Sequence, residues 1–137
     1  MDLDLECDTQ KFELRLTEYL DKENHITAEG FELLNHAITE VLKHAEEFQC
    51  EEILAFATSA IREANNGNEI IEKLQMTHEI ELQILSGDEE AQLTFLAARR
   101  WLGWSSGRLL VLDIGGGSLE MAVGNDESAS STLSLPI

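Results

Sequence analysis

The stretch from residue 111 to 120 combines an acid and three consecutive glycines at the end of an apolar run. The run 109–114 is apolar except for Asp113, a pattern typical of a central strand covered on both faces. A buried carboxylate needs a partner, and a metal ion is a natural one. Glycines can adopt positive φ angles, so the successive N–H groups of 115–117 could converge on an anion. This combination indicates phosphate chemistry.

The same residues are also compatible with a plain hairpin, in which the glycines are a flexible turn and Asp113 is its polar shoulder. The two best-known phosphate loops do not fit. The sequence contains no Gly-x-x-x-x-Gly-Lys-Ser/Thr, and the glycines precede an alternating pattern of Leu119, Met121 and Val123 rather than a helical one. We therefore expect a second strand after the turn, and neither a P-loop nor a Rossmann site.

Two hydroxyls and an arginine follow another apolar strand, predicted over 53–57. Thr58, Ser59 and Arg62 lie just past its carboxyl end, which is the usual ligand-binding edge of an open α/β sheet. Arginine can hold a phosphate through two N–H donors. Alternatively, Thr58 or Ser59 caps the next turn and Arg62 is solvated.

A cluster of acids begins the helix predicted after residue 86. Ser86 and Glu89 fit a capping box, and the helix dipole stabilises first-turn acids by roughly 0.3–1 kcal/mol. These structural roles leave Glu90 unexplained. A glutamate facing a phosphate site could orient and deprotonate a water nucleophile.

Other candidate metal ligands do not form a convincing set. His36, Glu40 and His44 follow one another at four-residue spacing along a predicted helix, where a solvated stripe explains them best. Cys7 and Cys50 lack metal-type spacing. Two such lone thiols fit a reducing cytoplasm, and we do not expect a disulfide between them.

The composition limits the partners of the chain. Its 137 residues are 43% hydrophobic, enough for one domain with a core, or for one domain and part of another. A net charge of −18 argues against binding a nucleic-acid duplex and opposes any polyanionic substrate. A phosphate ligand would therefore depend on backbone dipoles, Mg²⁺ and a few arginines. No apolar run approaches the roughly 18 residues of a membrane span, and no signal peptide is visible, so we expect a cytoplasmic protein without membrane contact.

The expected elements alternate along the chain. They are strands over 2–7 and 12–16 forming a hairpin, a helix capped by Thr27 and reaching Phe48, a strand over 53–57, a shorter helix around 70–74, a strand over 80–84, a helix ending at Gly103, and strands over 109–114, 119–123 and 132–135. This order favours an α/β or mixed α+β fold with layered helices.

Three segments together resemble the exopolyphosphatase and guanosine pentaphosphate phosphatase family, which has an actin-like, ribonuclease-H-like fold. They are Ala-Thr-Ser-Ala-Ile-Arg-Glu-Ala over 57–64, Ile-Leu-Ser-Gly-Asp-Glu-Glu-Ala over 84–91, and Leu-Asp-Ile-Gly-Gly-Gly-Ser-Leu-Glu over 112–120. The resemblance implies α/β architecture: most of a first actin-like lobe with a mixed sheet, flanking helices and its connecting helix over 1–103, then the opening strands of an incomplete second lobe over 104–137.

The resemblance also implies roles for individual residues. Glu90 matches the catalytic glutamate that activates water, and Asp113 and Glu120 match acids near Mg²⁺. Phosphate-binding roles fall on the second phosphate loop and on a segment lining the same cleft: Gly115, Gly116, Gly117, Ser118, Thr58, Ser59 and Arg62. The implied reaction is Mg²⁺-dependent release of terminal phosphate from polyphosphate or guanosine pentaphosphate, in which positioning and charge neutralisation supply most of the catalysis.

The chain also departs from the family pattern. Nothing in it resembles the family's first phosphate loop, Asp-x-Gly-Ser-Asn-Ser, and family members continue well past Ile137. We therefore expect an internal fragment with little or no phosphatase activity of its own, although its parent would be an enzyme. Unpaired strands at either end would invite self-association, for example as a homodimer.

Two other functions stay open. One is a regulatory module that binds polyphosphate or a phosphorylated nucleotide at an inactive site, and the other is a fragment of an actin-like kinase. A long polymer would need a basic track, for which Arg99, Arg100 and Arg108 are the nearest candidates. Arg99 and Arg100 could equally stabilise the last turn of their helix.

Overall fold

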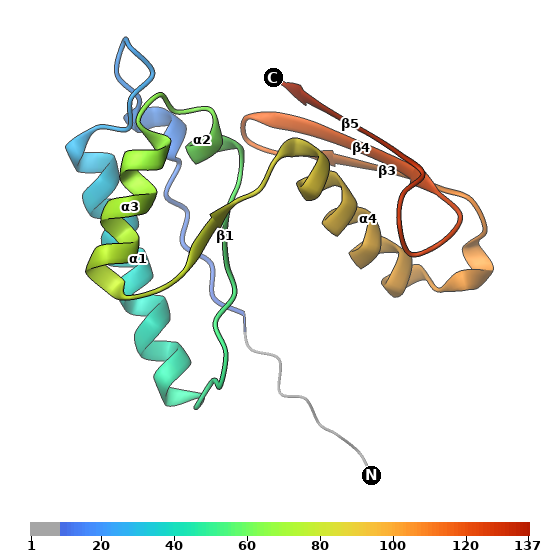
Figure 1. The fold of residues 1–137 in the computed structure, drawn as a ribbon, viewed down its shortest axis with the longest axis horizontal. Helices are drawn as coiled ribbons and strands as arrows, with labels where there is room; N and C mark the ends of the chain where they lie inside the picture. Colours follow the sequence, from blue (N-terminus) through green and yellow to red (C-terminus); the bar gives the residue numbers. More distant parts are fainter. Residues whose placement is uncertain (1–8) are drawn as a thin grey trace.

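The computed structural model describes residues 9–137, in which two groups of elements stand side by side (Figure 1). The first group runs η1 (Leu16–Tyr19), α1 (Ala28–Glu47), β1 (Ala55–Ala57), α2 (Ser59–Arg62), α3 (Gly67–His78) and β2 (Leu82–Ile84). The second runs α4 (Gly87–Leu102), η2 (Trp104–Ser106), β3 (Leu109–Ile114), β4 (Ser118–Gly124) and β5 (Ser131–Pro136).

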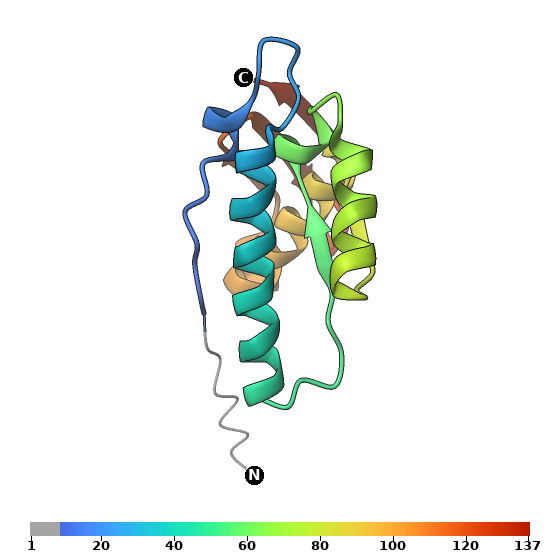
Figure 2. The same cartoon turned by 90° about the vertical axis from the view of Figure 1, so that its left-hand side faces the viewer.

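The first group is built on a short parallel sheet. β1 pairs with β2 in parallel, with Ala57 opposite Ile84, and α1 and α3 run alongside β1 (Figure 2). Apolar side chains recur along α1 at helical spacing and pack against a core of buried residues: Ile26, Ala57, Ile61, Ala64, Ile70, Ile71 and Leu74. The Thr27 hydroxyl accepts from the Gly30 N–H at 3.3 Å, which confirms the predicted N-cap.

The second group is an antiparallel sheet covered on one face by α4. β4 lies between β3 and β5, and Ala91 and Phe95 of α4 pack against buried residues of the sheet and its loop. The predicted capping box is confirmed, because the Ser86 N–H donates to Glu89 Oε2 at 2.8 Å and the Glu89 N–H donates to the Ser86 hydroxyl at 3.2 Å. α4 ends at Gly103, whose φ of 78° favours glycine.

The prediction that the strand over 109–114 is covered on both faces is wrong for this chain. β3 is an edge strand, and the side chains of Leu110, Leu112 and Ile114 are exposed. They point away from α4, toward a face on which no described element packs. Asp113 lies on the opposite face, under α4, where its carboxylate accepts a hydrogen bond from Thr94.

The strand predicted over 12–16 does not form. Residues 9–15 have no regular structure, and Leu16–Tyr19 is a turn of 3₁₀-helix. An alternating segment becomes a strand only beside another strand, and no described strand pairs with this one. The companion strand predicted over 2–7, with Cys7, lies outside the described residues.

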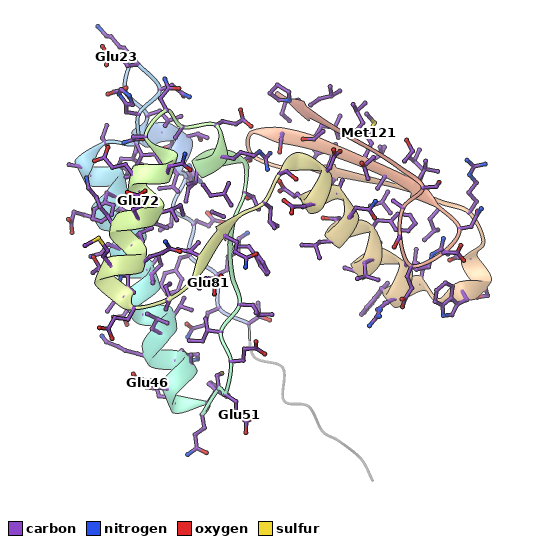
Figure 3. All side chains as sticks on the ribbon, in the orientation of Figure 1. Glu23, Glu46, Glu51, Glu72, Glu81 and Met121 are labelled. Carbon is purple, nitrogen blue, oxygen red and sulfur yellow. The ribbon has the colours of Figure 1, made fainter. Side chains whose placement is uncertain are left out.

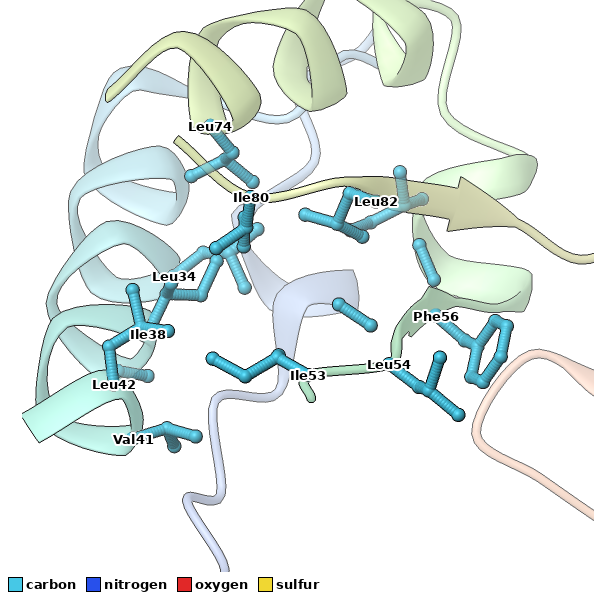
Figure 4. Close-up of a pocket in the computed structure, with 14 residues that line it drawn as sticks. Leu34, Ile38, Val41, Leu42, Ile53, Leu54, Phe56, Leu74, Ile80 and Leu82 are labelled. Carbon is cyan, nitrogen blue, oxygen red and sulfur yellow. The ribbon is translucent and has the colours of Figure 1, made fainter. Parts of the chain in front are cut away.

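The parallel sheet has an apolar side that the described elements leave open. A groove of about 370 Å³ runs between α1 and the two strands (Figure 4), and Leu54 and Phe56 on its rim are exposed. Regular pairing covers only part of the predicted strand over 53–57, because β1 begins at Ala55.

The surface of the described chain is strongly acidic. Glutamates project from loops and helices on several sides, among them Glu23, Glu46, Glu72 and Glu81, whereas Met121 lies on the sheet (Figure 3). Among the described residues, no helix is both long and apolar enough to cross a membrane.

Candidate functional site

The guanidinium of Arg62, in the last turn of α2, lies among three carboxylates. Its Nη1 donates to Glu90 Oε2 at 2.9 Å and to the Leu85 carbonyl at 2.8 Å. Its Nε donates to Glu63 Oε1 at 3.2 Å, and its Nη2 lies 3.8 Å from Glu120 Oε1. Because Glu90 lies on α4, Glu63 directly follows α2 and Glu120 lies on β4, Arg62 brings the three sequence motifs together at one point.

The site of Arg62 is largely shielded from water. The side chains of Arg62 and Glu90 are each 17% exposed, and that of Glu120 is 2% exposed. Burial lowers the pKa of Arg62, but the hydrogen bonds and charges of Glu90 and Glu63 outweigh it and hold that pKa above its ordinary value. Arg62 is therefore a permanent positive charge facing two acids that belong to different motifs.

A polar row crosses the antiparallel sheet under α4. Asp113 on β3 lies opposite Glu120 on β4, and Glu120 lies opposite Ser134 on β5. Each acid of the row accepts from a hydroxyl of another element: Thr94 of α4 donates to Asp113 Oδ2 at 3.1 Å, and Ser134 donates to Glu120 Oε1 at 2.9 Å. Since directly opposed residues share a face of the sheet, the two carboxylates are neighbours.

The glycine loop connects β3 and β4 without positive φ angles. The Gly115 N–H donates to the Ser118 carbonyl at 2.9 Å, and the left-handed glycines of the described chain, Gly103 and Gly107, lie outside the loop. The expected use of positive φ is therefore wrong. Within the described chain, the N–H groups of Gly116 and Gly117 donate no hydrogen bond, and the buried Ser118 hydroxyl has no partner.

The segment after β1 contributes unevenly. Ser59 is buried, and its hydroxyl lies 3.4 Å from the position that a Cβ on Gly117 would take, so it stands beside the glycine loop. Thr58 is exposed, and its side chain makes no capping hydrogen bond. The structure thus joins Ser59 and Arg62 to the other motifs but gives Thr58 no such contact.

An open cleft of about 510 Å³ lies over this region. Its lining comes from α2, the start of α4, β4 and β5: Arg62, Glu63, Ser86, Gly87, Asp88, Ser118, Thr132, Leu133, Ser134 and Pro136. Ser118 and Arg62 both line this cleft, and the unpartnered hydroxyl of Ser118 is buried. A ligand with negative oxygens would meet the positive charge of Arg62 there, beside the acids Glu63 and Asp88.

Other predicted candidates are not brought together. His36 is exposed, Glu40 pairs with Lys43 at 2.7 Å and His44 lies 3.3 Å from Glu47, so these side chains form the expected solvated stripe. Among the described residues, no group of three potential ligands could hold a metal by itself. Cys50 is exposed and free.

Arg99 is not part of a basic track. It is 1% exposed, lies over the Phe95 ring, and donates to the Ser106 hydroxyl and the Gly124 carbonyl at 3.0 Å each. Arg100 pairs with Glu127 at 2.8 Å. The suggestion that these arginines guide a polymer is therefore wrong for Arg99, which ties α4 to the end of β4.

Three residues of the site were not identified from the sequence. Thr94 lies one helical turn beyond Glu90, so its spacing alone places both on one face of α4. Thr132 and Ser134 alternate with Leu133 and Leu135, which predicts that the two hydroxyls share a face of β5. Helical spacing for Thr94 and strand alternation for Thr132 and Ser134 would therefore have predicted that these residues face the site.

Comparison with known proteins identifies the family. The family model described as the Ppx/GppA phosphatase family matches residues 7–137, so the chain belongs to that family. It is 48% identical over 127 residues to a protein of Mycobacterium tuberculosis named Exopolyphosphatase 1, covering 93% of this chain but 37% of that protein. The match to the Mycobacterium leprae protein of that name is 46% identical and covers 38% of it.

Solved structures agree. The Aquifex aeolicus Ppx/GppA family member superposes with a TM-score of 0.78 at 27% identity, over 90% of this chain and 40% of that one. An exopolyphosphatase from Cytophaga hutchinsonii gives a TM-score of 0.77 at 25% identity, over 84% of this chain and 37% of that one. The α/β actin-like fold class, with parallel and antiparallel strands and flanking helices, is confirmed. The chain spans less than two fifths of the curated relatives it matches.

Proposed function

We propose that this chain supplies the water-activating glutamate and one phosphate-binding loop of a Mg²⁺-dependent phosphatase that releases terminal phosphate from polyphosphate. The observation that carries the proposal is the position of Arg62, which joins Glu90 to the acid of the glycine-loop hairpin, Glu120. Family membership supports a phosphatase, and the named exopolyphosphatases among the relatives support polyphosphate as the substrate.

Phosphate oxygens would bind at the glycine loop. The free N–H groups of Gly116 and Gly117 and the unpartnered hydroxyl of Ser118 are donors of the kind that phosphate accepts from. Arg62 adds a positive charge in the cleft that Ser118 also lines. These local donors are needed because the chain as a whole carries a net charge of −18, which repels a polyanion.

The acids of the polar row fit a magnesium ion. Asp113 and Glu120 are adjacent, and each has one oxygen engaged by a hydroxyl, so the other oxygen of each can serve as a ligand. Mg²⁺ in proteins is typically held by one or two carboxylates together with water and substrate phosphate, so two acids suffice. When bound, the ion would neutralise charge on the phosphate oxygens.

Glu90 would act on the attacking water. Its carboxylate is kept in place by Arg62, which lines the cleft, and it lies on the helix face that also carries Thr94. In the reaction, an oxygen of water forms a bond to the terminal phosphorus, the bridging P–O bond breaks, and Glu90 accepts the proton of the water. Positioning of the water and the phosphate accounts for most of the rate in such a reaction.

Substitution of Glu90 tests this proposal in the full-length gene product. With Mg²⁺ and either polyphosphate or guanosine pentaphosphate, Glu90→Gln is expected to lower the rate of phosphate release by about 10²–10⁴-fold while ligand binding is retained. Glu46→Gln, an exposed glutamate on α1, is the matched control and should leave the rate unchanged.

The possible outcomes separate the alternatives. Binding without turnover by the wild-type protein would favour a regulatory module, and transfer of phosphate to an added acceptor would favour a kinase. Equal release by wild type and Glu90→Gln would contradict the role of Glu90. The 137-residue chain alone is expected to bind phosphate ligands with little turnover, because it contains one of the two phosphate loops.

A further inference from the structure

Ser134 stands between the buried acid of the polar row and the start of α4. Its hydroxyl donates to Glu120 Oε1 at 2.9 Å, and it lies directly opposite Glu120 in the sheet. A Cβ on Gly87, the first residue of α4, would lie 2.3 Å from both Cβ and Oγ of Ser134. The helix and the strand therefore meet at this serine, with no room for another atom between them.

The hydroxyl of Ser134 and the guanidinium of Arg62 face the same oxygen atom. Glu120 Oε1 lies 2.9 Å from Ser134 Oγ but 3.8 Å from Arg62 Nη2, so the serine makes a hydrogen bond and the arginine does not. Arg62 instead bonds Glu90 at 2.9 Å. Arg62 thus donates to Glu90 from Nη1 and to Glu63 from Nε, whereas its Nη2 faces Glu120 without a hydrogen bond.

We propose that Ser134 is a positioning residue, which holds Glu120 beyond hydrogen-bonding distance of Arg62 Nη2 and so preserves the arrangement in which Arg62 bonds Glu90 but not Glu120. This inference rests on the proposed function for its meaning in catalysis, but its structural part does not depend on it. A buried carboxylate that loses a donor must find another. Among the described residues, Arg62 is the cation within 4.0 Å of Glu120, so without Ser134 the existing 3.8 Å ion pair would shorten to a hydrogen bond.

The backbone around Ser134 makes this arrangement specific. Thr132, two residues earlier on the same face of β5, donates to Asp88 Oδ1 at 2.8 Å and ties the strand to the first turn of α4. Ser134 therefore cannot follow Glu120 if that side chain turns toward Arg62. The Ser134 hydroxyl therefore fixes the position of the Glu120 carboxylate. Glu90 lies three residues after Gly87 on α4, so the contact between Gly87 and Ser134 also fixes the position of Glu90 relative to Glu120.

The first test uses the ligand-free protein. In Ser134→Ala, the guanidinium proton and nitrogen resonances of Arg62 should shift, and their exchange with water should change, because Nη2 gains Glu120 as a hydrogen-bond partner. Ser130→Ala is the matched control, since its hydroxyl donates to the Val123 carbonyl at 3.0 Å, away from the site. An unchanged Arg62 signal in Ser134→Ala would overturn the proposal, whatever the protein's activity.

The second test measures binding by calorimetry with Mg²⁺ and tripolyphosphate. Ser134→Ala should weaken the joint binding about tenfold, the size expected for one hydrogen bond to a charged group. In Glu120→Gln the same serine change should have little further effect, because Ser134 acts through Glu120.

These experiments distinguish a failure of the role of Ser134 from a failure of the proposed function. Wild-type binding combined with additive losses in the double variant would overturn the role of Ser134 and leave the proposed function standing. Absence of wild-type binding would count against the proposed function, while the Arg62 resonances would still decide the role of Ser134.

Discussion

At the scale of single residues, burial separates two ion pairs of nearly equal length. Arg62–Glu90 spans 2.9 Å with both side chains 17% exposed, whereas Arg100–Glu127 spans 2.8 Å with side chains 67% and 49% exposed. Water screens the second pair and lets its ends reorganise freely. The first pair is enclosed, so the loss of one partner leaves a poorly hydrated charge behind.

We expect Arg62→Met to lower the free energy of unfolding by about 2 kcal/mol, because Glu90 and Glu120 lose their nearby cation. Arg100→Met should cost less than about 0.5 kcal/mol. Urea unfolding of both variants beside wild type measures the difference. Equal losses would show that burial does not govern the strength of these pairs.

The sequence motifs predicted which residues lie together in the site, but they did not predict the contacts that hold those residues in place. Arg62, Glu90 and Glu120 belonged to three recognisable motifs, and the structure brings them together. Ser134 carried no motif, because a serine in an alternating strand is ordinary, and its importance depends on the strand register that places it opposite Glu120. The chemical roles of the predicted site residues remain predictions.

At the scale of elements, the junction of α4 with β5 depends on a glycine. Gly87 is the first residue of α4, where alanine would normally be the better helix former by about 1 kcal/mol. The close approach of Ser134 opposes that gain, because the contact would involve its Cβ as well as its hydroxyl. Overpacking of this kind typically costs about 1–3 kcal/mol.

Gly87→Ala is therefore expected to destabilise the protein by about 1–2 kcal/mol in spite of its better helix propensity. Gly116→Ala is the comparison for stability, because a Cβ there would meet nothing within 4 Å and φ is not positive. Thermal unfolding followed by circular dichroism gives both values. Stabilisation by Gly87→Ala would contradict the prediction, because it would show that β5 moves at Ser134 to accommodate the added methyl group at little cost in free energy.

The helices were predictable because their signals are local. The cap at Thr27, the capping box at Ser86 and the stop at Gly103 each lie within a few residues of the end they define. The strands depended on neighbours instead. The apolar run over 109–114 forms an edge strand in this chain, and the alternation over 12–16 has no described strand beside it, so in both cases the pattern alone could not supply the partner.

At the scale of the whole molecule, residues 9–137 leave two apolar surfaces open on a highly charged chain. One is the groove beside β1, and the other is the sheet face formed by Leu110, Leu112 and Ile114. Apolar faces of this kind favour association, whereas the net charge of −18 opposes it. The balance between the two depends on ionic strength, since added salt screens only the repulsion.

We expect the 137-residue chain to self-associate more strongly in about 0.5 M salt than in about 0.05 M salt, as the Debye length shortens. Leu112→Asp, which places a charge on the open sheet face, should reduce that association. Met76→Asp is the control, because Met76 is an exposed apolar residue on α3 and the change of charge is the same. Sedimentation velocity at several concentrations measures the effect, and equal behaviour of the two variants would exclude the sheet face.

The route by which the two halves are connected also sets an order of assembly. β3, β4 and β5 follow one another as a meander with short connections, so their contacts can form soon after the chain collapses. β1 can reach β2 only after α2 and α3 have formed a crossover between them, and the Arg62–Glu90 pair joins residues 28 apart. The sheet that carries Asp113 and Glu120 should therefore exist before the arginine that faces it arrives, and the pair would be among the last contacts made.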